Sequence, residues 1–259
     1  MRIGFLVILC FVLILPRQVK CQAIVSTELS QPYLNTISSF TKSLSKKKSS
    51  EINLAKSLFH KAHRNFLKNY HAYATVNDIF EKGNYDCLSG TYFLSNALNN
   101  LGIKHRIIET NYHVFLIAET NRGDVLMEST DRYQGFVNDP AKIQERINAY
   151  KTNGTDKINN QLYLSHIKIY REILKDQLSG LLYFNLAVES FHRNDLIASC
   201  QYLQHAWKIY DNPRIEEFAP ILARSVLKSQ LSEKQKIDLT ELLKSHEHFN
   251  LTAQAIRQN

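Results

Sequence analysis

The segment Gly83–Gly90, with the sequence Gly-Asn-Tyr-Asp-Cys-Leu-Ser-Gly, contains the side chain best suited to nucleophilic chemistry. Its first two residues are typical of a turn, and Asp86 is of a type that caps helix N-termini. Cys87 is therefore predicted to lie in the first turn of a helix, where the partial positive charge of the helix end favours the thiolate, the nucleophilic form of cysteine. The adjacent carboxylate of Asp86 opposes this effect, because it disfavours a second negative charge.

A thiolate nucleophile works with a histidine base, whose ring is oriented by an acceptor. His113 opens a strand predicted over residues 112–119, and Glu128 lies on the next predicted strand, at 124–129. If the intervening loop has an even number of residues, His113 and Glu128 face the same side and Asp131 faces the other, whereas a one-residue bulge reverses this. We take Glu128 as the orienting acceptor and Asp131 as the reserve.

Several predicted elements must position these residues. Apolar spacing near 3.6 residues predicts helices over about 54–70 and 87–100, the second ended by Gly102. Short β-branched or aromatic segments predict strands at 104–110, 112–119 and 124–129, with a hairpin turn at 121–124. From Pro140 onward the pattern is helical again. The order predicts an α+β domain at 51–139, followed by a helical region at 140–259.

The Gly-Asn-Tyr-Asp-Cys helix start, the His-Val-Phe strand and the acid on the following strand resemble the transglutaminase-like superfamily of papain-fold cysteine enzymes. The resemblance covers roughly residues 50–135 and implies a helix bearing Cys87 packed on an antiparallel sheet bearing His113 and the acid. Phe115 matches an aromatic residue often found two positions after the family histidine. The family commonly has Asp-Pro-Thr where this chain has Glu128-Ser129-Thr130, so a longer acid takes the orienting place.

The resemblance also implies an activity. Cys87 attacks a carboxamide or peptide carbonyl and forms a thioester, while His113 moves the proton and Glu128 fixes the imidazole tautomer. The backbone N–H of Cys87 is the expected oxyanion donor, and Asn84 or Tyr85 is a candidate for the second donor. Water would release an acid and an amine would form a crosslink, so hydrolysis and acyl transfer both stay open. The expected substrate is a protein or peptide, and no cofactor or metal is expected.

The C-terminal region contains one unit spaced like a tetratricopeptide repeat, at about residues 180–213. A plain helical hairpin explains the same apolar spacing. The short Cys-to-acid spacing together with this helical tail resembles the bacterial branch of the superfamily that carries such repeats. The main alternative to an enzyme is a catalytically inactive scaffold that binds protein partners through its groove and tail. A repeat adaptor with an incidental N-terminal domain would instead place its largest concave surface in residues 160–240.

Residues 1–21 are typical of a secretory signal, with a basic start, an apolar run from Ile3 to Leu15, and Cys21 before the expected cleavage. The run is short for a membrane-spanning helix, which needs roughly 20 residues, so an uncleaved anchor is the alternative. We expect an extracytoplasmic protein, secreted or periplasmic, with no membrane contact beyond this segment. Residues 22–50, rich in Ser, Thr and Lys, are expected to be a leader that is at most partly ordered.

The overall composition is that of a globular protein. The chain has 259 residues, 44% hydrophobic and 22% charged, with only 8 Gly and 5 Pro, which excludes collagen and low-complexity disorder. The formal net charge is +8. Removing the signal segment takes away three basic residues and no acid, leaving 29 − 24 = +5. A Lys46–Lys48 run favours a solvated linker over an anionic partner, and no basic face interleaved with aromatic residues indicates nucleic-acid binding.

Two cysteines, Cys87 and Cys200, remain outside the signal segment. They could form a disulfide, or each could have its own role, with Cys200 expected to be a buried helix-packing residue. His60 and His63 lie three residues apart on the first predicted helix and are expected on a solvated face rather than in a metal site. The two histidines at 246 and 248 are attributed to tail composition. The Asn-Gly-Thr at 153–155 and Asn-Leu-Thr at 250–252 are glycosylation acceptors only in a eukaryotic secreted chain.

Overall fold

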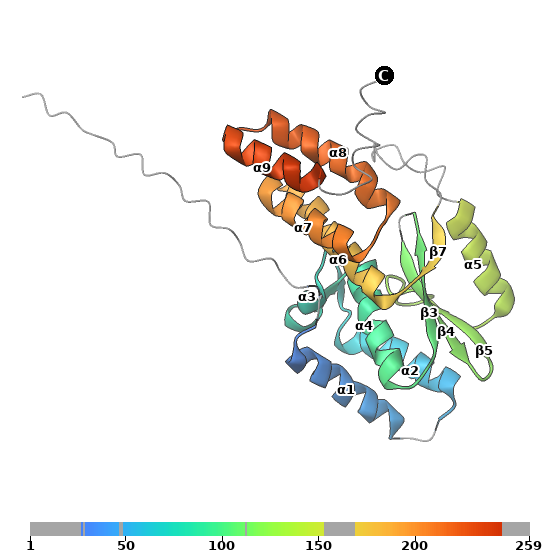
Figure 1. The fold of residues 1–259 in the computed structure, drawn as a ribbon. Coiled ribbons are helices and arrows are strands. Elements are labelled where there is room, and N and C mark those ends of the chain that lie inside the picture. The colour runs from blue at the N-terminus through green and yellow to red at the C-terminus, as the bar shows by residue number, and fades with distance from the viewer. Residues whose placement is uncertain (1–26, 28, 47–48, 112, 153–168, 245–259) are drawn as a thin grey trace, which may run out of the picture.

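The computed structural model describes residues 27, 29–46, 49–111, 113–152 and 169–244 as helices with a central antiparallel sheet, followed by a run of four helices (Figure 1). The helices are α1 (Gln31–Ser45), α2 (Glu51–Asn65), α3 (Val76–Glu81), α4 (Cys87–Asn100), α5 (Pro140–Thr152), α6 (Lys175–His192), α7 (Leu196–Ile209), α8 (Pro213–Lys228) and α9 (Glu233–Lys244). The strands are β1 (Asn69–Tyr70), β2 (Asn84–Tyr85), β3 (His105–Thr110), β4 (Val114–Thr120), β5 (Gly123–Met127), β6 (Phe136–Val137) and β7 (Tyr170–Ile173). The fold class is therefore α+β, as predicted.

The central sheet has five antiparallel strands in the order β6-β5-β4-β3-β7. Two residues separate β4 from β5, and Leu116 is paired with Met127. This even-numbered loop places His113 and Glu128 on the same face of the sheet, because side chains alternate with a period of two. A separate parallel pair, β1 with β2, lies just before α4.

The two faces of the sheet are covered by different helices, with α4 on one side and α5 on the other (Figure 1). Leu116 and Met127 belong to the cluster that packs with α4. Their neighbours along the strands, Phe115 and Leu126, belong to the cluster that packs with α5. The alternation means that the face carrying His113 and Glu128 is the α5 face, so Cys87 on α4 must meet them around the end of the strands.

Helix α4 is the centre of the fold. Every residue from Leu88 to Leu98 is buried, and the helix packs against α1, α2, α3, α6 and the sheet. Its predicted limits are observed, because both ends carry local signals. Asp86 and Ser89 form a capping box at the start, and Gly102, with a φ of 69°, follows the end in the left-handed conformation.

The predicted leader at 22–50 contains α1, which buries Ile37, Phe40 and Leu44 against the rest of the core. Two expectations about the other elements are wrong. The first predicted helix ends at Asn65, and Tyr70 belongs to β1. The region expected to be helical from residue 140 contains β7, which pairs with β3. Sequence after residue 140 therefore contributes to the central sheet.

The C-terminal helices share their core with the α+β part. Leu178, Leu181 and Tyr210 belong to the same apolar cluster as α4, and α6 to α9 form a second cluster among themselves. Ser199 donates to the carbonyl of Ala187 at 2.8 Å, so α6 and α7 approach closely at this small residue. In the described part of the chain, no helix is both long and apolar enough to cross a membrane.

Some expectations fall outside the described residues. These are the signal segment at 1–21, the second and third lysines of the basic run, the Asn-Gly-Thr at 153–155, and the histidines and Asn-Leu-Thr near the C-terminus.

A glycine governs how closely α4 approaches the strand that leads to Glu128. A Cβ on Gly90 would lie 2.9 Å from both Cβ and Oγ of Ser129 and 3.1 Å from Cδ2 of Tyr85. Gly-to-Ala inside a helix ordinarily stabilises by up to about 1 kcal/mol. We expect Gly90→Ala to destabilise the protein by about 1–3 kcal/mol instead, because the added methyl forces the packed elements apart.

Chemical denaturation measures this difference. Asn99→Ala, at an exposed position of the same helix, is the matched control and should be neutral or slightly stabilising. A Gly90→Ala variant as stable as the control would contradict the close approach of α4 to Ser129.

Candidate active site

Cys87 is the first residue of α4 and is partly exposed. The capping carboxylate of Asp86 accepts from the backbone N–H of Ser89 at 2.7 Å and from Nδ2 of Asn185, on α6, at 2.9 Å. Burial raises the pKa of Asp86 to about 6, although these hydrogen bonds act in the opposite direction. The thiol thus lies where a helix N-terminus, the sheet and a C-terminal helix meet.

His113 lies at the turn between β3 and β4, and its backbone is fixed by Thr110. The Thr110 N–H and hydroxyl both donate to the carbonyl of His113, at 2.8 and 3.0 Å, and the His113 N–H donates to the Thr110 hydroxyl at 3.1 Å. The imidazole is mostly buried, and its Nε2 contacts a carboxylate oxygen of Glu128. This contact leaves Nδ1 as the other ring nitrogen. Cys87 is among the side chains that raise the pKa of the imidazole.

These partners control the charge of the imidazole. Burial alone would lower the pKa of His113, but hydrogen bonds and negative charge from Cys87 and Glu128 outweigh it and raise the pKa to about 10. Burial likewise acts to raise the pKa of Glu128, but its bonds with His113 and Thr130 lower the pKa below its usual range. The arrangement therefore favours an imidazolium paired with the Glu128 carboxylate.

Glu128 follows the end of β5 and is almost fully buried. One of its oxygens contacts Nε2 of His113 and also accepts from the Tyr150 hydroxyl at 2.8 Å. The other accepts from the Thr130 N–H at 3.1 Å and the Thr130 hydroxyl at 2.8 Å. The orientation of the carboxylate is fixed from three directions, so the imidazole beside it is fixed too.

The reserve acid, Asp131, has partners other than His113. Its carboxylate accepts from the backbone N–H groups of Tyr133 and Gln134, at 3.2 and 2.8 Å, and lies 3.2 Å from Nη2 of Arg146. The structure therefore places Glu128, not Asp131, beside His113.

Tyr150, on α5, is the site residue that sequence reasoning missed. Its ring stacks on the imidazole of His113, with centroids 5.5 Å apart, and on Phe115 at 4.9 Å, while its hydroxyl reaches Glu128. The ring thus covers the imidazole and the hydroxyl shares the same carboxylate. No sequence motif marks Tyr150. It lies on α5, 22 positions beyond Glu128, and reaches the site only in the folded protein.

The two candidates for a second oxyanion donor lie in β2. Asn84 pairs with Asn69 of β1, while the Tyr85 carbonyl accepts from the His71 N–H at 2.8 Å and its ring packs near Gly90. Among the described residues, no hydrogen bond joins either candidate to Cys87.

His63 and Cys200 are buried packing residues. His63 was expected on a solvated face but is buried, 1% exposed, with its ring 4.6 Å from that of Phe59 and 5.9 Å from that of Tyr85. Burial lowers the pKa of His63 to about 4. Cys200 is fully buried on α7, where burial raises the pKa of its thiol to about 12, and neither cysteine forms a disulfide. Within the described ranges, no cluster of His, Cys, Asp or Glu could hold a metal ion.

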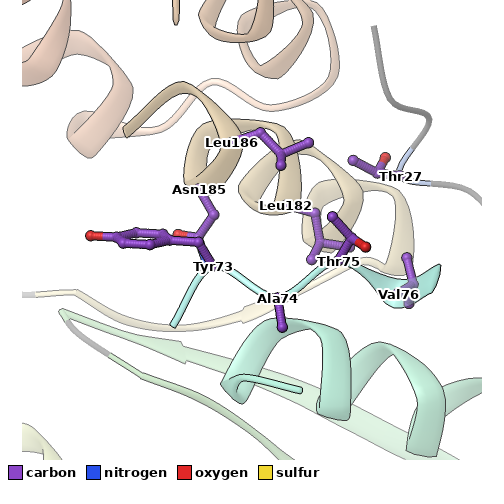
Figure 2. Close-up of a pocket in the computed structure, with 8 residues that line it drawn as sticks. All are labelled: Thr27, Tyr73, Ala74, Thr75, Val76, Leu182, Asn185 and Leu186. Atoms are coloured by element: carbon purple, nitrogen blue, oxygen red, sulfur yellow. The ribbon is translucent and has the colours of Figure 1, made fainter. Parts of the chain in front are cut away.

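Two hollows lie near these residues. An open depression of about 390 Å³ reaches the imidazole, and its lining residues are His113, Glu128, Thr130, Asp131, Arg146, Ala149 and Tyr150. A second hollow, between the loop at 73–76 and α6, holds only about 10 Å³ and is lined almost entirely by apolar surface (Figure 2). The second is too small for a substrate, although Asn185 on its wall is the residue that contacts Asp86.

No family model, no curated protein and no solved structure matches this chain.

Replacing Glu128 tests the electrostatic coupling directly. Glu128→Gln keeps the shape of the side chain and removes its charge. We expect the pKa of His113 to fall by about 1–3 from its value near 10, because an adjacent opposite charge is lost. NMR titration of the imidazole, assigned with a His113→Asn variant, measures the change. An unchanged pKa in Glu128→Gln would show that the carboxylate does not control the imidazole.

The same coupling predicts how stability depends on pH. The pKa of His113 is raised in the folded protein, so protonation stabilises the fold fully below the unfolded value of 6.5, and this contribution is lost as the pH rises toward 10. We expect the difference in free energy of unfolding between wild type and His113→Asn to shrink between pH 6.5 and pH 10. Urea denaturation at a series of pH values provides the measurement, and a constant difference would be inconsistent with the prediction.

Proposed function

We propose that this chain is an exported cysteine enzyme that acts on a protein or peptide amide through a Cys87 thioester. The observation that carries the proposal is that the His113 imidazole contacts Glu128 and has its pKa raised by both Glu128 and Cys87, three residues assembled from a helix N-terminus, a hairpin turn and a strand end. A nucleophile bonded to a base that is bonded to an orienting acceptor is the arrangement required for covalent acyl chemistry.

The reaction follows from the contacts. His113 holds the proton of the Cys87 thiol as an imidazolium, at Nδ1, and the thiolate sulfur attacks the carbonyl carbon of the amide. The oxyanion forms near the positive end of α4, where the Cys87 N–H can donate to it. His113 returns the proton to the leaving amine, and a thioester remains. Water then releases a carboxylic acid, or a second amine forms a new amide. Glu128 and Tyr150 hold the imidazole in one orientation throughout.

The finer fold assignment is part of the proposal. The chain resembles the transglutaminase-like superfamily in the order of Cys87, His113 and the acid, with Glu128 in the orienting place. A helix carrying Cys87 against an antiparallel sheet supports that resemblance. The α6–α7 pair supports a tetratricopeptide-like unit at about 180–213, with Ser199 at the closest approach. We assign the helical run a role in contacting protein substrates or partners.

Amine incorporation tests the activity. The full chain is incubated with β-casein and dansylcadaverine, a fluorescent primary amine, and conversion of glutamine to glutamate is followed in parallel by mass spectrometry. We expect one of the two products, with complete loss in Cys87→Ala and a rate about 10²–10⁴-fold lower in His113→Ala, because the base is removed. Cys200→Ala is the matched control and should retain activity, because Cys200 is buried on α7.

The alternative, an inactive scaffold, predicts a different result. In that case neither product forms, and His113→Ala does not change the rate at which iodoacetamide alkylates Cys87. Alkylation is read by peptide mass spectrometry, so each cysteine is followed separately. This result would remove the enzyme assignment.

A further inference from the structure

Arg214, near the start of α8, carries a guanidinium buried deep inside the protein. The residue is 8% exposed. Its Nη2 donates to the carbonyl of Thr110 and lies 3.5 Å from Oε1 of Glu109, while its buried Nε has no hydrogen-bond partner. A buried guanidinium is costly unless anionic groups surround it, so its neighbours define its role.

Through Thr110, the guanidinium reaches the turn that carries His113. Thr110 is the residue whose N–H and hydroxyl hold the His113 backbone, and its own carbonyl is held by Arg214. Asn212 fixes the arginine in turn, because its Oδ1 caps the Arg214 N–H at 2.9 Å while its Nδ2 donates to Glu109 at 2.8 Å. The position of His113 therefore depends on a contact from the C-terminal helices.

Buried charges hold Arg214 in place. Glu109 is fully buried and lies between two guanidinium groups, those of Arg171 and Arg214. Arg171 is partly in solvent, whereas Arg214 is not. Because Glu109 is itself held by Asn212, it fixes the Arg214 guanidinium beside the Thr110 carbonyl.

We propose that Arg214 is a positioning residue for the reaction of Cys87: it holds the hairpin that carries His113. The inference rests on the proposed function. It makes the C-terminal helices a structural part of the active site rather than a separate recognition module.

The test is the rate of Cys87 alkylation by iodoacetamide in the full chain, measured between about pH 5 and pH 10 by peptide mass spectrometry. Other charged or titratable groups around this site also affect the pH profile. They are Tyr70, Asp86, His113, Glu128, Tyr150 and Arg214. We expect Arg214→Met to lower the rate about 10-fold at pH 7 and to move the pH profile toward higher pH, because the hairpin loses its anchor and the imidazole no longer stabilises the thiolate.

Two other variants separate the Thr110 contact from packing. Arg214→Lys retains a charged N–H donor for the Thr110 carbonyl and should recover part of the rate. Arg171→Met removes the other guanidinium on Glu109 and should leave the rate within about 2-fold of wild type, because Arg171 contacts Glu109 from β7 and does not hold the Thr110 carbonyl. Cys200 is an internal control in every sample, since it should stay unlabelled while the protein is folded.

A double variant covers the case in which Arg214→Met fails to fold. Glu109→Gln/Arg214→Met removes both charges together and leaves no unpaired buried carboxylate. If Arg214 acts on Cys87, the folded double variant has the same low rate and shifted profile. A double variant or an Arg214→Met variant with the wild-type profile would overturn the proposal. If wild-type Cys87 is itself insensitive to His113→Ala, the proposed function fails first, and the role of Arg214 fails with it.

Discussion

The carboxylate of Glu109 has no contact with solvent and must be satisfied entirely by the protein. It accepts from Arg171 on β7 at 3.0 Å, and from Tyr210 at 2.5 Å and Asn212 at 2.8 Å at the junction of α7 and α8. Leaving such a group unpaired costs several kcal/mol, so the edge of the sheet and the C-terminal helices must come together for either to be stable. The apolar cluster shared by α4 and α6 imposes the same requirement.

This constraint explains why the candidate site is built from distant segments. Asn185 on α6 contacts the cap of the helix that carries Cys87, and Arg214 contacts the hairpin that carries His113. The helical run therefore touches both halves of the site through buried polar contacts. A division at residue 139, drawn from the change of pattern along the sequence, separates elements that depend on one another physically.

The parts of the fold that the sequence predicts are those specified by local chemistry. Asp86 and Gly102 mark the ends of α4 because a capping carboxylate and a left-handed glycine act within a few residues. His113 and Glu128 lie on the same side of the sheet because the loop between their strands has two residues and side chains alternate along each strand. These rules locate the three residues of the proposed site.

The remaining features depend on contacts that no local pattern records. Strand β7 has only four residues, with two charged side chains, and becomes a strand because β3 offers it an unpaired edge. Tyr150 and Arg214 lie on helices whose own periodicity says nothing about a distant imidazole or thiol. His63 is similar, since a histidine on an amphipathic helix is buried here only because Phe59 and Tyr85 cover it.

The position of Arg214 in the chain also sets the order in which the protein can mature. During synthesis, Cys87, His113 and Glu128 emerge well before the segment that closes around Glu109. Until that segment arrives, the carboxylate stays hydrated and the hairpin lacks its anchor, so a nascent chain carries the reacting groups without their final geometry. On the proposed assignment, the thiol gains a base of fixed position only after residues 210–214 have been made.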